Sequence, residues 1–107
     1  MDQQGLVSQL IRVPGVAGAV IVTTDGMVLA HQLPGDVEKH GAAAALMGAM
    51  ATQIGHTLNL GAFSSAVVEM SNASMLVQER PDCYVGLVLE ESAAPASIVL
   101  QTRSMLQ

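Results

Sequence analysis

The chain has almost no aromatic side chains, since its 107 residues include one Phe, one Tyr and no Trp. Aromatic rings usually supply much of the buried area of a small core, so Ala, Val, Leu, Met and Gly must carry the packing here. Half of the residues are nevertheless hydrophobic, which is ample for one core. We therefore expect a single domain that spans residues 1–107.

Basic residues are also scarce, with 4 Lys and Arg against 9 Asp and Glu and a formal net charge of −5. The four are Arg12, Lys39, Arg80 and Arg103, and they are scattered along the chain. A protein that binds nucleic acid or an anionic membrane needs clustered Lys and Arg to displace counterions or to be attracted to the lipid surface. The sequence therefore predicts neither kind of partner.

Cys83 is the only cysteine, so a disulfide within one chain is impossible. It lies inside an apolar run, which predicts a buried and unreactive thiol. The N-terminus shows no basic segment followed by an apolar segment, so no secretory signal is visible. The longest apolar run, residues 41–51, is too short to span a bilayer. We expect a soluble cytoplasmic protein.

Motifs for catalysis and cofactor binding are missing too. No phosphate-binding loop precedes Lys39, and no serine lies in a G-x-S-x-G motif. His40 and His56 share one predicted helix but have no histidine or cysteine four residues further on, and His31 is remote from both. We interpret all three as surface or interface residues rather than metal ligands. The sequence therefore predicts no catalytic residue, no cofactor, no metal site and a non-enzymatic role.

What the chain does contain is a clear order of elements. Pro14 and Gly15 end a first helix, because Pro lacks the backbone donor and Gly accepts a positive φ. Asp25 and Gly26 are typical of a tight primed turn in a hairpin, and Asp36 is a suitable N-cap. The predicted elements are a helix over residues 2–12, strands over 16–23 and 27–31, a helix over 36–59, strands over 64–70, 74–80 and 83–89, and a helix over 92–107.

Two of these strands are apolar on both of their faces. The strand over residues 16–23 carries Val and Ile on either side, and the strand over residues 83–89 is the most apolar of all. A strand of this kind is expected in the centre of a sheet that is covered on both sides. The sequence therefore predicts an α+β fold in which the sheet lies between two layers of helices.

The helix over residues 36–59 has an unusual distribution of side chains. Large apolar residues fill one arc: Leu46, Met47, Met50, Ile54 and Leu58. Beside that arc lies a stripe of small residues at steps of three and four: Gly41, Ala44, Gly48, Ala51 and Gly55. Each interior glycine costs about 1 kcal/mol relative to alanine, and close approach of another backbone compensates for that cost. We predict a second helix against this stripe; seating of the helix on its own sheet is the alternative.

The third side of the same helix carries few charges. Its residues are Ala42, Ala45, Ala49, Thr52, Gln53 and His56. Exposed surfaces with few charges often mark the site of a partner, while cover by the chain's own elements is the alternative explanation.

The ordered set of these motifs resembles the roadblock family, which includes the roadblock-type dynein light chain and MglB-like bacterial regulators. The resemblance covers nearly the whole chain. The residues that carry it are 13–16, the strand up to Val22, Asp25 and Gly26, residues 28–30, the Ala-rich helix, and residues 67–70 and 84–89. It implies a five-stranded antiparallel sheet with helices on both faces.

The resemblance also implies a homodimer, formed through the middle helix and the edge strand that follows it, with one sheet continuing across both subunits. Transferred to this chain, the interface comprises the helix over residues 36–59 and the strand over residues 64–70. The predicted dimer contacts are therefore the small-residue stripe together with Ser65, Val67 and Glu69 of that strand.

In prokaryotes, members of this family often regulate a small Ras-like GTPase, and some accelerate its GTP hydrolysis. The resemblance thus implies a non-enzymatic homodimeric regulator of such a GTPase. Ala45, Ala49, Thr52, Gln53 and His56 are the predicted contacts for this partner. An arginine acting in trans would stabilise transition-state charge, but we interpret Arg12, Arg80 and Arg103 each as surface charge.

Two other functions remain open from the sequence. The chain is alternatively a structural adaptor that joins larger proteins, as the dynein light chain does. A small-molecule sensor is the other alternative, and it requires a roomy apolar cavity with a few polar groups. The many Ala and Gly residues indicate tight packing, which argues against such a cavity.

Overall fold

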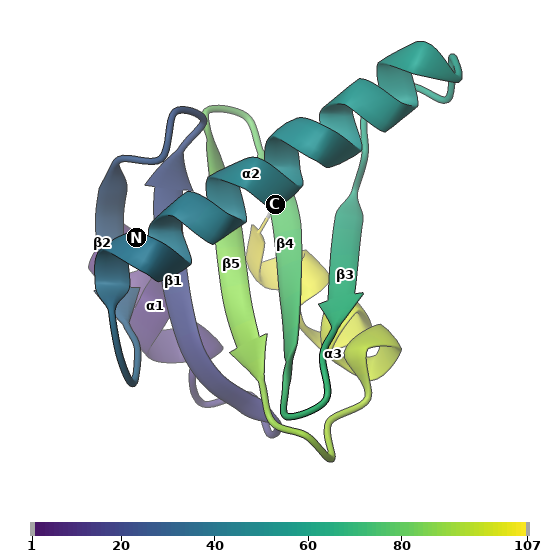
Figure 1. Ribbon diagram of the computed structural model, residues 1–107. Coiled ribbons are helices and arrows are strands. Elements are labelled where there is room, and N and C mark those ends of the chain that lie inside the picture. The colour runs from purple at the N-terminus through teal and green to yellow at the C-terminus, as the bar shows by residue number, and fades with distance from the viewer. Residues whose placement is uncertain (1, 107) are drawn as a thin grey trace.

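The computed structural model describes residues 2–106 and shows a five-stranded antiparallel sheet with helices around it (Figure 1). Met1 of the predicted domain and Gln107 of the last predicted helix lie outside the described residues. The elements are α1 (Gln3–Leu10), β1 (Val16–Thr23), β2 (Val28–Gln32), α2 (Val37–Thr57), β3 (Ser65–Glu69), β4 (Ser74–Arg80), β5 (Cys83–Leu89), α3 (Pro95–Arg103) and a short 3-10 helix, η1 (Ser104–Leu106). The predicted order of helices and strands is confirmed.

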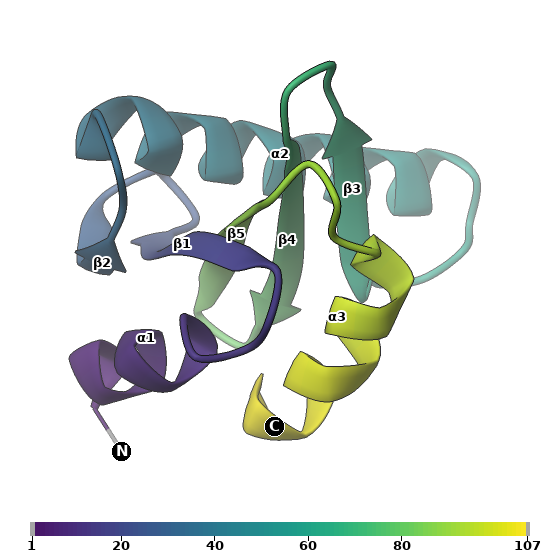
Figure 2. The same cartoon turned by 90° about the horizontal axis from the view of Figure 1, so that it is seen from below.

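The strands are arranged in the order β2-β1-β5-β4-β3, so β2 and β3 form the two edges of the sheet. Helix α2 crosses one face, and α1 and α3 cover the other (Figure 2). The central strands β1 and β5 are almost wholly buried because helices cover both of their apolar faces. The predicted layering and the central place of β5 are confirmed.

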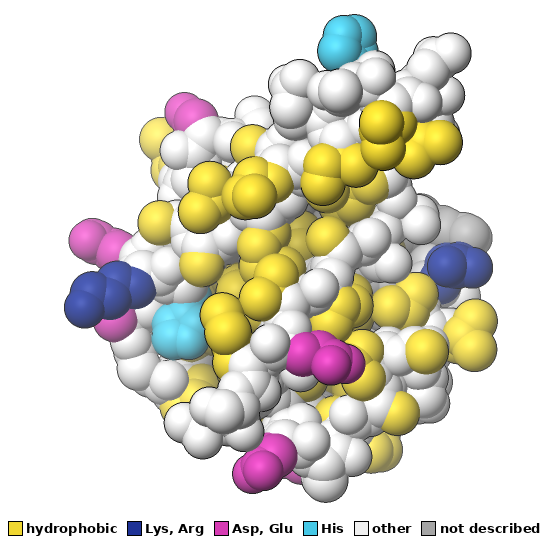
Figure 3. Space-filling view, turned by 45° about the vertical axis from the view of Figure 1, so that its right-hand side comes forward, with side chains coloured by type: hydrophobic (Ala, Val, Ile, Leu, Met, Phe, Trp, Pro, Cys, Tyr) yellow, Lys and Arg dark blue, Asp and Glu magenta, His cyan; other side chains and the backbone are white. Residues whose placement is uncertain are grey.

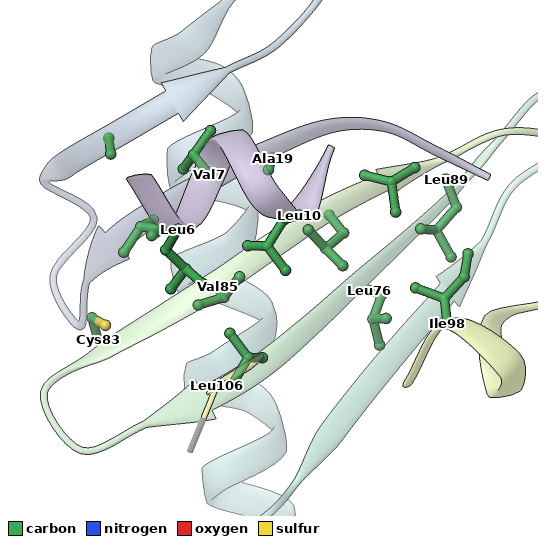
Figure 4. Packing of buried hydrophobic residues seen from close by; sticks show 14 residues of the cluster. Leu6, Val7, Leu10, Ala19, Leu76, Cys83, Val85, Leu89, Ile98 and Leu106 are labelled. Carbon is green, nitrogen blue, oxygen red and sulfur yellow. The ribbon is translucent and has the colours of Figure 1, made fainter. Parts of the chain in front are cut away.

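The two faces of the sheet hold different cores. Figure 4 shows Leu6 and Leu10 of α1 and Ile98 of α3 pointing toward the strands, where they join a cluster of large aliphatic side chains. The core under α2 is smaller and consists of Val20, Val22, Ala44, Val77 and Tyr84. Because α2 contributes Ala44 as its buried side chain to that core, its backbone lies close to the sheet.

The hairpin between β1 and β2 corrects one prediction. The Met27 carbonyl accepts from the Thr23 N–H over 2.9 Å, and the Thr23 carbonyl accepts from the Gly26 N–H over 3.0 Å. A primed two-residue turn of type I′ needs positive φ at both central residues, but among residues 2–106 the only non-glycine residue with positive φ is Asn59. The loop therefore has three residues and ends on Gly26 at φ +95°.

The ends of the helices follow local chemistry. The Asp36 carboxylate accepts from the Lys39 N–H over 3.1 Å, which confirms Asp36 as the N-cap of α2. Helix α3 begins at Pro95 rather than near Ser92, because proline suits a first turn in which its missing N–H has no partner to lose. The chain after Arg103 tightens into η1 instead of continuing the predicted helix.

A buried polar pair joins α3 to β4 and carries a first testable prediction. The Thr102 hydroxyl lies 2.9 Å from Gln78 Oε1 and 2.8 Å from the Ile98 carbonyl oxygen, and both side chains are buried. Thr102→Val keeps the shape but leaves the Gln78 amide oxygen without its donor. We expect the free energy of unfolding, measured in urea, to fall by about 1–3 kcal/mol.

The matched control for this prediction removes both partners. In the double variant Thr102→Val with Gln78→Leu no buried acceptor is left without a donor, so most of the lost stability is expected to return. A loss below about 0.5 kcal/mol in Thr102→Val alone, the range of ordinary surface changes, would contradict a role for this hydrogen bond in holding α3 on the sheet.

Candidate functional site

The small residues of α2 face the chain's own sheet. Gly41, Ala44, Gly48 and Gly55 are buried within the single chain. A Cβ built on Gly48 would lie 2.5 Å from Cε2 of Tyr84, and one built on Gly41 would lie 2.8 Å from Cγ2 of Val28. At Gly55 an added Cβ would collide with the carbonyl oxygen of Gly61. A side chain at any of these positions would therefore force a neighbouring group inside the chain to shift.

This placement corrects the predicted dimer contacts. Gly41, Ala44, Gly48 and Gly55 have almost no surface left for a second chain, and Ala51 is half-buried. The alternative interpretation, in which the stripe seats α2 on its own sheet, is the one that the structure shows. Helical periodicity identifies a face of small residues, but it does not identify the backbone or ring that approaches that face.

The large apolar residues of α2 point away from the sheet instead. Leu46, Met50, Ile54 and Leu58 expose 61%, 56%, 55% and 62% of their surface. On β3, Val68 pairs with Met75 on the side of the sheet that α2 covers, and Met70 lines a hollow together with His40 and Ala43 of α2. We call Leu46, Met50, Ile54, Leu58, Val68 and Met70 the apolar band, and Figure 3 shows hydrophobic side chains gathered along this part of the surface.

Sequence reasoning identified the arc of large residues on α2 but did not assign it to an interface. The signal was present, because a helix with adjacent small and large apolar faces can bury only one of them against a single sheet. The residues that the prediction missed are therefore Leu46, Met50, Ile54 and Leu58.

The edge strand β3 lies beside the apolar band. Within residues 2–106 it pairs only with β4, so its other edge has no strand partner. The three predicted contacts on this strand, Ser65, Val67 and Glu69, line a groove on the face that α3 covers, away from α2. Val67 and Glu69 are exposed and Ser65 is half-buried, so all three keep surface at the edge of the sheet.

The third side of α2 is largely uncovered. Ala49, Thr52, Gln53 and His56 are exposed, and Ala45 is half-buried beside the hairpin loop at Gly26. The Thr52 hydroxyl donates to the Gly48 carbonyl over 2.8 Å, and the Gln53 amide donates to the Thr57 hydroxyl over 3.0 Å. We call Ala45, Ala49, Thr52, Gln53 and His56 the alanine flank. Apart from the exposed His56 ring, its side chains are short or bonded within the helix, and none of those four carries a formal charge.

Reactive groups contribute little to the described surface. Among residues 2–106 no group of three or more His, Cys, Asp or Glu side chains is placed to hold a metal ion. Burial raises the pKa of the Cys83 thiol, and the positive charge of Arg80 opposes that shift only in part. The thiol is therefore protonated at neutral pH and a poor nucleophile. No helix in the described part of the chain has the length and apolar character to cross a membrane.

The chain matches a protein-family model, and its fold is similar to those of solved structures. The family model described as "Roadblock/LC7 domain" matches residues 2–90. No curated protein sequence matches the chain. The fold is similar to the crystal structure of a Roadblock/LC7 domain from Streptomyces avermitilis, with a TM-score of 0.87 and 18% identity over 99% of this chain and 92% of that chain.

Two further solved structures are similar. The gliding protein MglB from Thermus thermophilus has a TM-score of 0.82 and 19% identity, over 96% of this chain and 82% of that chain. Profilin II from Acanthamoeba castellanii has a TM-score of 0.70 and 18% identity, over 98% of this chain and 94% of that chain. At such identities these likenesses establish the fold alone.

Proposed function

The chain belongs to the Roadblock/LC7 family, and from this premise we propose that it is a homodimeric, non-enzymatic regulatory subunit that binds a small Ras-like GTPase and modulates its GTP hydrolysis cycle. The observation that carries the proposal is the apolar band on α2 and β3, which a single chain leaves open to water. Residues of this size are usually buried, and a contiguous exposed group of them marks a protein interface.

A second copy of the chain fits this surface. A two-fold axis beside β3 brings the same apolar band from both copies together, so each α2 covers the other. The same operation places the open edge of β3 next to its counterpart, where the two strands complete each other's hydrogen bonds. The proposed dimer contact thus covers both the apolar band and the open edge of β3.

The alanine flank supports the second half of the proposal. It lies on a different side of α2 from the apolar band, so the proposed dimer leaves it accessible. Its short side chains let the backbone of a partner approach closely, and His56 and Gln53 offer polar groups at one end. We assign this flank to the GTPase. None of the arginines lies on α2. The proposed effect on GTP hydrolysis therefore comes from positioning the catalytic groups of the GTPase itself and not from an arginine of this chain.

The experiment measures binding and phosphate release with a small Ras-like GTPase from the same genome, beginning with one encoded beside this chain's gene. We expect the chain to bind the GTP-loaded form and to change the rate of phosphate release. Ala49→Asp places a carboxylate in the alanine flank and is expected to weaken binding roughly tenfold or more, since an unpaired charge at a contact is costly to desolvate.

Sedimentation of the same variant separates the proposed dimer from the proposed GTPase contact. Ala49→Asp is expected to remain a dimer by sedimentation, because the substitution lies outside the apolar band. Absence of binding and of any change in phosphate release with the unaltered chain would overturn the GTPase assignment. Recovery of scaffold proteins in place of a GTPase would instead support the adaptor function.

A further inference from the structure

A separate pocket lies where the end of β4, the segment before β3 and the chain from α3 to η1 meet. Its volume is about 420 Å³, and Phe63, Ser64, Gln78, Arg80, Pro81 and Arg103 line it. This volume is within the range of small-molecule sites, roughly 300–1,000 Å³. No residue of the apolar band or of the alanine flank lines the pocket, but Ser64 directly precedes β3, whose open edge takes part in the proposed dimer.

The charge of this pocket is opposite to that of the chain. The sequence has four Lys and Arg residues and a net charge of −5. Two of those four, Arg80 and Arg103, line this one pocket, together with a single acidic residue, Glu79. The two arginines are 23 positions apart, and folding brings them to one place. Within this lining the positive side chains outnumber the acidic one, while Arg80 also lines a neighbouring pocket that contains Asp2 and Asp82.

One N–H of the Arg80 guanidinium lacks a hydrogen-bond acceptor among the described residues. Its Nε is buried and has no hydrogen-bond partner among residues 2–106. A buried N–H without an acceptor is unfavourable and is uncommon in folded proteins. Because solvent does not reach Nε, an anion in the pocket would be bonded by the terminal N–H groups of this guanidinium.

Gln78 offers a further donor. Its side chain is buried, and its amide oxygen accepts from the Thr102 hydroxyl over 2.9 Å. With the oxygen occupied, the polar group that remains on the amide is its NH₂, which only donates. The Ser64 hydroxyl is another donor in the lining. Arg80, Arg103, Gln78 and Ser64 therefore form a lining rich in donors.

We propose that this pocket binds a small organic anion whose carboxylate or phosphate is held by Arg80 and Arg103. Planar guanidinium groups match the oxygens of both anions and bond them in pairs. The apolar body of the ligand packs on Phe63 and Pro81, which line the same pocket. The rings of Phe63 and Tyr84 form a tilted pair with their centroids 6.0 Å apart.

The test uses benzoate and phenyl phosphate as probes, because each carries one of the two anionic groups on an aromatic body. The protein is titrated with each probe at constant ionic strength, and the side-chain N–H signals of Arg80 and Gln78 are followed by NMR. We expect these signals to shift and to saturate with at least one probe. Arg103→Gln removes an exposed guanidinium and is expected to weaken that binding roughly tenfold.

Arg12→Gln is the matched control. It removes the same charge from an arginine that does not line the pocket, and it is expected to leave the affinity unchanged. Saturation by benzoate alone assigns a carboxylate ligand, and saturation by phenyl phosphate alone assigns a phosphate ligand. Failure of both probes to saturate, or equal weakening by Arg12→Gln and Arg103→Gln, would overturn the proposal.

Discussion

Ile54→Asp is expected to convert the protein from a dimer into a folded monomer. Ile54 exposes 55% of its surface in the single chain, so a carboxylate at this position remains hydrated and the monomer keeps its fold. In the proposed dimer the same carboxylate would be buried among apolar side chains without a partner. An uncompensated buried charge costs about 3–5 kcal/mol, which corresponds to a rise of at least about 100-fold in the dissociation constant. Sedimentation velocity at micromolar concentration measures the change.

The control for this prediction carries the same charge on the same helix. Ala49→Asp lies in the alanine flank and is expected to sediment as a dimer, while circular dichroism shows both variants folded. A monomer for the unaltered chain at micromolar concentration would remove the apolar band as a dimer interface. Loss of the dimer in Ala49→Asp as well would place the contact on a different side of α2.

Gly48→Leu is expected to destabilise the fold strongly. A Cβ at this position would lie 2.5 Å from Cε2 of Tyr84 and 2.6 Å from its Cδ2. The Tyr84 ring is buried on β5 within the core under α2, so it has little room to move aside. Helix α2 must then lift from the sheet. Overpacking alone costs typically about 1–3 kcal/mol, and with the loss of core contacts we expect the free energy of unfolding in urea to fall by about 3 kcal/mol or more.

The neighbouring substitution Ala49→Leu separates this effect from helix propensity. Leucine is a better helix former than glycine by somewhat less than about 1 kcal/mol, so local propensity alone predicts that Gly48→Leu stabilises the chain. Ala49 is exposed, and Ala49→Leu is expected to change the stability by less than about 0.5 kcal/mol. Had the stripe of small residues formed the dimer contact, Gly48→Leu would instead yield a stable monomer.

Much of the fold was predictable because the signals are local. Val16–Thr23 and Cys83–Leu89 are apolar on both faces, which predicts central strands under two layers of helices, and both strands are central in the sheet. Asp36 has the chemistry of an N-cap and acts as one. The hairpin loop was less predictable, since Asp25 and Gly26 suit both two-residue and three-residue loops and the pairing of Thr23 with Met27 decides between them.

In the candidate site, too, some features follow from the sequence alone and others only from the tertiary structure. The sequence alone determined a long helix with one face of small residues and one of large apolar residues, because each face depends on spacing along a single helix. Which face meets the sheet was decided by tertiary structure, since it depends on the Tyr84 ring, 36 positions after Gly48, which leaves room only for a glycine. The pocket at Arg80 and Arg103 likewise exists only after folding, because the spacing of residues along the chain does not show which distant side chains line the same pocket.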